Sequence, residues 1–331
     1  MESVTLRTGA LLFFFSAVGF AAVTSVELVD RSDVLDGASF GSAGPYERII
    51  AKVHFAVDPK VQANRIIADI DLAPRNEEGK VEFSADLFVL KPRDSAKGNG
   101  TALFEISNRG GRGLLATFDF ATKSDYGDQF LLQRGFTLVW VGWEFDVPPT
   151  DAPPAEELLR LYAPIATRDG QPITGLVRSE WTGDRRVSTI PLGDRNQIGY
   201  PVADPHAVEN RMLVRDTVVG ERREIPRDKW SFSDSRHVTM ADGFEQGKIY
   251  EVIYRAKDPV VVGWGRRRFV TRFRSSSTAR WRRCWAINTI TSSARSGSGF
   301  PKVGAFCGRF CMTVSIRMRR IGGCLTVCGQ R

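Results

Sequence analysis

One serine of this chain stands between glycines in a pattern that can expose a nucleophilic hydroxyl. Gly37-Ala38-Ser39-Phe40-Gly41 fits G-x-S-x-G. Such a serine serves as a nucleophile where a strand leads into it and a helix leads away, because that strained turn holds the hydroxyl outward. Here Asp36 precedes the pattern and a Gly-Pro pair closes it at residues 44–45, so no helix is expected to begin there. We interpret Ser39 as a loop serine.

Histidine and cysteine, the common transition-metal ligands, are placed without the spacing of a metal site. The three histidines are His54, His206 and His237. None of them has a second histidine four residues away or a cysteine nearby, so ligand spacing is absent. Two C-x3-C pairs occur near the C-terminus, but nothing around them organises a zinc site. The chain also lacks the glycine patterns that bind nucleotide phosphates or dinucleotides. We predict no metal and no cofactor.

The charge of the chain is divided sharply along its length. The net charge is +8, yet residues 1–258 hold 31 basic and 38 acidic side chains, whereas residues 259–331 hold fourteen Arg, one Lys and no acid. All five cysteines also lie in the basic part. A native basic tail can bind nucleic acid or an anionic membrane, but such a tail does not need Cys and Trp scattered without pattern. We therefore expect no nucleic-acid partner.

The N-terminus has the layout of a secretory signal peptide. Residues 9–23 are apolar or small apart from Ser16, and Arg7 precedes them. The run is shorter than the ~20 apolar residues that a membrane-spanning helix needs, and small residues at its end offer cleavage points. We assign residues 1–25 to a signal peptide and expect an exported protein, periplasmic or secreted, with no stable membrane span after cleavage. An uncleaved N-terminal anchor is the alternative.

Most of the following body reads as strands and turns. Apolar runs bounded by turn residues predict strands at residues 46–57, 66–72, 81–90, 101–107, 136–143 and 248–256. The run at 136–143 shows no alternation, which favours a strand covered on both faces, as in a parallel sheet. Residues 114–132 are predicted to form a helical or irregular crossover. A Pro-rich break at residues 148–154 separates this part from shorter extended segments.

Two stretches of the body resemble the early core of an α/β-hydrolase. The predicted strand TALFEIS runs into Asn108-Arg109-Gly110-Gly111, and the next strand follows Arg134-Gly135-Phe136. With GPYERIIAKVHFAVDP, VGWEFD and KIYEVIYRAKDPVVVG, these motifs make residues 26–263 resemble a bacterial family of exported α/β-hydrolase-domain proteins. The resemblance implies the α/β class: a truncated α/β-hydrolase-like sheet with a β-rich N-terminal and insert region. It also implies that Asn108, Arg109, Gly110 and Gly111 form the loop that supplies an oxyanion N–H donor.

The nucleophile of that family is missing from its expected place. The family's serine elbow, G-x-S-Q-S-G-R, follows the VVVG segment, where this chain continues into the basic tail of residues 264–331. The tail is typical of a coding sequence read one base out of frame, since a shift by one base permits the elbow within residues 299–309. The serine codon is then read as Pro301. We interpret residues 264–331 as an aberrant, irregular tail, frame-shifted and disordered.

These patterns predict a hydrolase-family chain that is inactive in this form. The resemblance implies acyl transfer from a small-molecule ester to water, with the acid and the histidine following the serine in chain order. Both would then lie beyond Arg331, so we assign no catalytic residue to this chain. The alternative is a non-catalytic, exported, β-rich binding module. The sequence leaves the substrate, the cleavage position and the oligomeric state open.

Overall fold

The computed structural model describes residues 22–122, 125–154, 156–193 and 197–264. Strands account for 42% of the structure and helical turns for 14%. The predicted signal peptide, apart from its last residues, lies outside the described part. The predicted tail lies outside it too, except for Trp264. No helix within the described ranges is long and apolar enough to cross a membrane.

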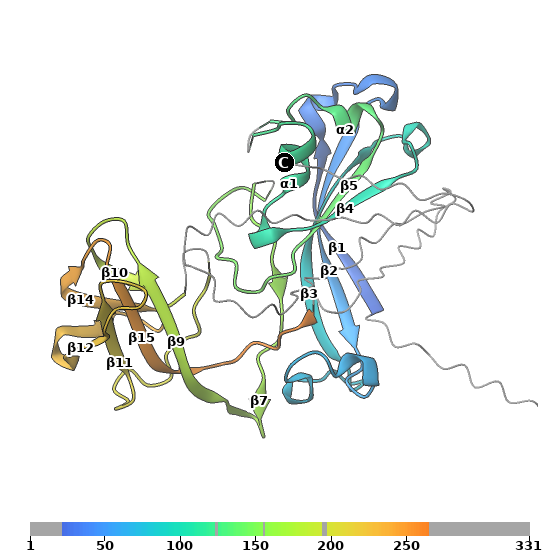
Figure 1. Ribbon diagram of the computed structural model, residues 1–331. Helices are drawn as coiled ribbons and strands as arrows, with labels where there is room; N and C mark the ends of the chain where they lie inside the picture. Colours follow the sequence, from blue (N-terminus) through green and yellow to red (C-terminus); the bar gives the residue numbers. More distant parts are fainter. Residues whose placement is uncertain (1–21, 123–124, 155, 194–196, 265–331) are drawn as a thin grey trace, which may run out of the picture.

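The first sheet is built around three long antiparallel strands (Figure 1). Its order is β1-β2-β3-β5-β4, with β6 also pairing with β3. The strands are β1 (Ala22–Asp33), β2 (Tyr46–Val57), β3 (Val81–Pro92), β4 (Ala102–Ile106), β5 (Thr137–Val141) and β6 (Leu161–Tyr162). Within this sheet only β4 and β5 run parallel among the described strands. The apolar run at 136–143 therefore forms a parallel pair and is buried over all of β5.

Helices contribute little to the fold. The described residues contain two α-helices, α1 (Gly113–Phe118) and α2 (Phe130–Gln133). The remaining helical turns are short 3₁₀ segments: η1 (Val34–Gly37), η2 (Gly41–Ala43), η3 (Gln62–Asn64), η4 (Ile70–Leu72), η5 (Ser95–Lys97), η6 (Asn108–Gly110) and η7 (Arg227–Lys229). The crossover between β4 and β5 is interrupted by left-handed residues at Phe120 (φ 53°) and Gln129 (φ 63°), which prevent one long helix.

The prediction of an α/β fold with a truncated hydrolase-like sheet is wrong. A layered α/β fold needs helices that cover a mostly parallel sheet. The described residues instead form several separate sheets, mostly antiparallel, and two short α-helices. The error has a physical cause. The sequence motifs at residues 101–143 describe one parallel pair correctly, but they carry no information about how residues 167–257 pair with one another.

Those later residues form a second, antiparallel region (Figure 1). One sheet has the order β12-β11-β15-β9 and another has the order β10-β14-β13. The strands are β9 (Thr174–Thr182), β10 (Val187–Pro191), β11 (Arg211–Arg215), β12 (Arg223–Ile225), β13 (Trp230–Phe232), β14 (His237–Phe244) and β15 (Ile249–Lys257). A small hairpin of β7 (Thr167–Arg168) and β8 (Gln171–Pro172) precedes them. The two larger sheets share one buried cluster that includes Met212, Val238 and Tyr250.

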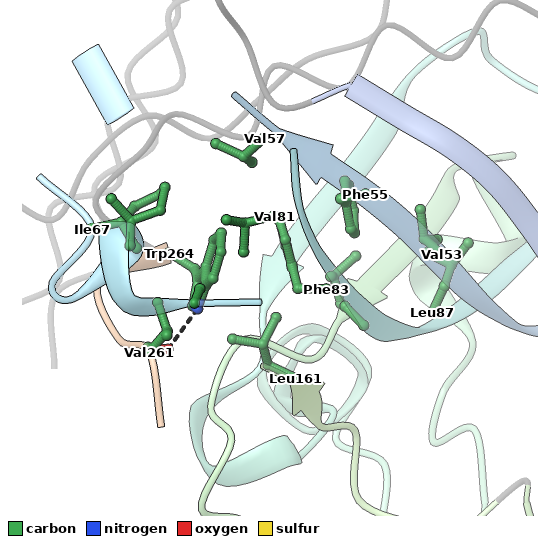
Figure 2. Packing of buried hydrophobic residues seen from close by; sticks show 14 of the residues in the cluster. Val53, Phe55, Val57, Ile67, Val81, Phe83, Leu87, Leu161, Val261 and Trp264 are labelled. Carbon is green, nitrogen blue, oxygen red and sulfur yellow. Dashed lines mark hydrogen bonds between the residues drawn. The ribbon is translucent and has the colours of Figure 1, made fainter. Parts of the chain in front are cut away.

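After β15 the chain returns to the first sheet and packs against it (Figure 2). The Phe55 and Phe83 rings, cross-strand partners on β2 and β3, stack with centroids 4.8 Å apart. The ring centroids of Trp264 and Phe83 are 4.1 Å apart, and the Trp264 indole N–H donates to the carbonyl of Val261. Burying each such ring contributes about 2–3 kcal/mol. Trp264, the first residue of the predicted tail, is therefore part of this core.

The opposite face of the sheet carries a second apolar cluster under α1 and α2. Tyr46 is its polar anchor: the buried hydroxyl donates to the carbonyls of Leu132 and Phe136, each at 2.9 Å. Burial, with a contribution from Asp119, raises the pKa of Tyr46 well above its usual value, so the hydroxyl stays a donor. This tie fixes the end of α2 on the sheet.

Three strand predictions that rest on apolar runs between turn residues are confirmed. Residues 46–57, 81–90 and 248–256 fall on β2, β3 and β15. The predicted strand at 66–72 is wrong, because Asp69 has a left-handed backbone (φ 59°) and η4 follows it. Two of its apolar residues, Ile67 and Ile70, are buried in this turn and join the core beneath the sheet, whereas Ile66 is exposed.

Candidate functional site

The predicted oxyanion loop lies where the two parallel strands end. β4 ends at Ile106 and β5 ends at Val141, and the segments that follow lie together. The carboxyl ends of parallel strands are a frequent place for ligand sites in open sheets. The first segment contains Asn108 to Gly111, partly as η6, and the second contains Trp143 to Asp146. The structure therefore brings the predicted loop next to two carboxylates that follow β5.

Two consecutive left-handed residues shape this loop. Arg109 has φ 50° and Gly110 has φ 75°. Gly110 also lies against the backbone of Leu159, whose N–H donates to the Gly110 carbonyl at 3.0 Å. A Cβ at this position would be 2.7 Å from the Leu159 oxygen. Glycine is required here for both reasons, whereas the strained Arg109 must be held by other contacts.

Those contacts come from the carboxylates after β5. The backbone N–H of Arg109 donates to Glu144 Oε2 at 2.6 Å. Its guanidinium donates to Asp146 Oδ1 at 2.8 Å and to the Asp146 carbonyl at 3.0 Å, with Glu144 Oε2 3.4 Å away. Trp143 closes the arrangement, donating from its indole N–H to the Ser107 carbonyl at 2.7 Å. We call Arg109, Glu144 and Asp146 the Arg109 cluster; it holds one cation and two carboxylates.

Three of the four N–H groups of the loop, those of Arg109, Gly110 and Gly111, are therefore engaged within the protein. Arg109 N–H is bound by Glu144, Gly110 N–H points to the Ser107 carbonyl at 3.4 Å, and Gly111 N–H donates to the Asn108 carbonyl at 3.0 Å. An oxyanion hole needs N–H groups aimed at the place where negative charge develops. Here a negatively charged carboxylate of the protein occupies the acceptor position at Arg109. A reacting oxyanion would have to displace Glu144.

Glu105, on β4, is a partly buried carboxylate with a structural role beside this loop. Its oxygens accept from the N–H groups of Gly113 at 3.1 Å and Leu114 at 2.8 Å, at the start of α1. They also accept from the Trp140 indole at 2.5 Å. Burial raises the pKa of Glu105, and these hydrogen bonds partly oppose the rise. Glu105 thus ties α1 to both parallel strands.

Asp119, just after α1, is the least satisfied carboxyl of this region. Its side chain is fully buried; Oδ1 accepts from the Leu131 N–H at 3.1 Å, and Oδ2 is buried without a hydrogen-bond partner. Burial, followed by the nearby Asp128, raises the pKa of Asp119 to about 6, with the Leu131 hydrogen bond acting in the opposite direction. The crossover therefore carries a carboxyl that holds its proton more tightly than an exposed aspartate does.

The histidines and the patterned serine are not brought together. Ser39 is exposed in a loop between η1 and η2, with no strand leading into it. His54 contacts Glu27 at 3.3 Å and His237 contacts Asp234 at 2.9 Å, both near the surface. Within the described ranges no histidine ring is hydrogen-bonded to a serine hydroxyl, and no group of three His, Cys, Asp or Glu side chains could hold a metal. The cysteines lie outside those ranges.

Sequence reasoning found the loop but missed the residues that hold it. Glu144 and Asp146 follow the most apolar strand of the body directly, in the phrase WEFD. Acids at the carboxyl end of a buried strand were a usable signal, because such positions line the same sheet edge as the neighbouring loop. Glu105 was also visible as the one charged residue of an otherwise apolar strand.

Comparison with known proteins adds no assignment. No family model, no curated protein and no solved structure matches this chain. The hydrolase-family resemblance therefore stays a prediction.

Proposed function

We propose that this chain is a binding protein that does not hydrolyse esters. The observation that supports the proposal most directly is the bond from the Arg109 N–H to Glu144 Oε2 at 2.6 Å. It uses the donor that the predicted oxyanion loop would offer to a reacting carbonyl. Export of the protein belongs to the same proposal and is supported by the N-terminal sequence pattern alone.

Ester hydrolysis by a serine needs two arrangements at once. A base must lie within hydrogen-bond reach of the hydroxyl, and open N–H donors must face the developing oxyanion. In the described part of the chain, His54 and His237 contact carboxylates, and Ser39 lies apart in its own loop. Neither arrangement has support among these residues.

Ester hydrolysis remains a prediction for an intact member of the resembled family. The position of its serine, Pro301 in this chain, lies outside the described residues. A chain with a restored frame would need to supply the serine, the acid and the histidine, and would need an oxyanion donor other than the engaged Arg109 N–H.

The proposal is tested on the purified full chain with p-nitrophenyl esters and a fluorophosphonate probe. We expect hydrolysis at the buffer rate and no stoichiometric labelling. The Ser39→Ala variant is the matched control, because it removes the one serine in a G-x-S-x-G pattern. Stoichiometric labelling that Ser39→Ala abolishes would overturn the proposal and make Ser39 a nucleophile.

A further inference from the structure

The outer face of the sheet formed by β9, β11, β12 and β15 carries a buried carboxylate surrounded by arginines. Glu251 lies on β15 between Tyr250 and Val252, which point into the apolar cluster, so its own side chain points to the other face. Its side chain is only 3% exposed. The burial of a charge at this level demands partners, and three guanidinium groups provide them.

The three arginines reach Glu251 from different strands. Arg222 donates from Nε to Oε1 at 2.9 Å, and Arg178 on β9 donates from Nη1 to Oε2 at 3.3 Å. Arg215 on β11 donates to Oε1 as well and uses its other terminal nitrogen for Glu180, at 2.6 Å. These five side chains, Arg178, Glu180, Arg215, Arg222 and Glu251, are the Glu251 cluster.

The topology explains why Arg215 is buried. Arg222 directly precedes β12, and β12 is separated from β15 by β11. The Arg222 side chain must therefore cross β11 to reach Glu251, and it passes over the strand that carries Arg215. The Arg215 side chain is 4% exposed, and its Nε is buried without a hydrogen-bond partner.

The Glu251 cluster has more donors than acceptors and more positive than negative charge. Three guanidinium groups face two carboxylates, leaving one excess positive charge. Arg178 and Arg222 are about half exposed, and each spends one nitrogen on Glu251. Their other nitrogens make no hydrogen bond to the described residues, and Glu251 between them fixes both groups in place. A guanidinium remains charged at every physiological pH and binds oxyanions through paired N–H groups.

We propose that Arg178 and Arg222 form a binding site for the phosphate or carboxylate group of a small molecule. The anion bridges their outward N–H groups above Glu251 and neutralises the excess charge of the cluster. This inference rests on the proposed function, since it names the ligand class of the binding protein. The proposed function and the anion site can fail separately, because ester hydrolysis tests the first and anion binding tests the second.

The experiment measures binding of inorganic phosphate to the full chain by equilibrium dialysis, at low and constant ionic strength balanced with sodium chloride. A parallel series with succinate distinguishes a phosphate from a carboxylate ligand. We expect one saturable site, weakened about tenfold in Arg178→Gln and in Arg222→Gln, as for the loss of one charge-assisted contact. The anion with the lower dissociation constant identifies the ligand group.

Arg211→Gln is the matched control. Arg211 lies on β11 of the same sheet and is half exposed, but Glu224 engages it through Nε and Nη2. All three variants remove one positive charge, so any binding by the basic tail changes equally in each. We expect Arg211→Gln to bind as the unaltered chain does.

A second variant guards against simple misfolding. Glu180 is a half-exposed carboxylate beside Arg215, and it repels an incoming anion. Glu180→Gln is therefore expected to tighten phosphate or succinate binding about threefold, a gain that an unfolded chain would not show. The proposal is overturned if neither anion shows a saturable site, or if all three arginine variants weaken binding equally. It is also overturned if Glu180→Gln leaves binding unchanged.

Discussion

The Arg109 cluster and the Glu251 cluster use the same chemical groups in opposite proportions. The first places one arginine between two carboxylates at the end of the parallel strands, and the second places three arginines around two carboxylates on an antiparallel sheet. In the first, the carboxylates hold a strained loop residue and use its N–H groups. In the second, a buried carboxylate holds two half-exposed arginines, each by one nitrogen, and their other N–H groups stay without a protein acceptor among the described residues.

The Arg109 cluster is therefore closed to a ligand, whereas the Glu251 cluster is open to one. Hydrogen-bond donors that already have acceptors add nothing to binding, because a ligand must first break those bonds. An excess of fixed donors with like charge has the opposite effect, since a ligand of opposite charge satisfies them. The place expected from the sequence to bind an oxyanion is therefore the closed one.

The largest expected effect comes from removing the charge at the centre of the open cluster. Glu251→Gln replaces a buried carboxylate by an amide whose NH₂ group must face a guanidinium. We expect the free energy of unfolding to fall by about 4 kcal/mol, because breaking a buried ion network leaves charge uncompensated. Urea denaturation measures it. Glu224→Gln, at an exposed pair on the same sheet, should cost far less; equal losses would show that burial does not distinguish the two pairs.

The second largest loss of stability is expected from Gly110→Ala, in the loop that carries the Arg109 cluster. Gly110→Ala places a methyl group against the Leu159 backbone at a positive φ, and we expect a loss of roughly 2–3 kcal/mol. Gly79→Ala is the control, because Gly79 has nearly the same φ with nothing within 4 Å of the added Cβ. That variant should lose about 1 kcal/mol. Similar urea midpoints for both would mean that the loop yields to the methyl group.

The third prediction concerns Asp119, a buried carboxyl without an arginine or lysine partner among the described residues. Burial raises the pKa of Asp119 to about 6, above its unfolded value of ~3.9. The folded state then binds the proton more tightly, so this contribution to stability is present at low pH and is lost as pH rises through 6. Between pH 5 and 7.5 we expect the chain to lose about 1.4 kcal/mol relative to Asp119→Asn.

Urea denaturation of both proteins at the two pH values measures that difference. A stability difference between the two proteins that does not change with pH would show that the Asp119 carboxyl is not the group that titrates.

The smallest loss of stability is expected in the Arg109 cluster, which has two carboxylates for one arginine. Glu144→Gln keeps an oxygen that accepts from the Arg109 N–H, and Asp146 still pairs with the guanidinium. We expect a change below about 1 kcal/mol in the free energy of unfolding, in contrast to Glu251→Gln. A loss as large as that of Glu251→Gln in the same urea series would contradict the division into closed and open clusters.

Five strands of the body, β2, β3, β4, β5 and β15, could be predicted because their signals are local. β2, β3 and β15 alternate or run apolar between turn residues, and β5 is apolar throughout. The class of the fold could not be predicted in the same way, because strand pairing joins residues far apart in the chain. The run at 66–72 shows the limit even locally, since its apolar residues serve a turn as well as they would serve a strand.

From the sequence alone come the positions of β2, β3, β4, β5 and β15, the acidic body with its basic tail, and the loop Asn108 to Gly111. Only the tertiary structure decided that Glu144 takes the N–H of Arg109, thirty-five residues away, and that three arginines meet at Glu251. The reason is that a side chain's charge and hydrogen-bonding groups are fixed by its identity. Whether those groups remain available depends on which strands and loops the fold brings beside it, and on how much water it leaves there.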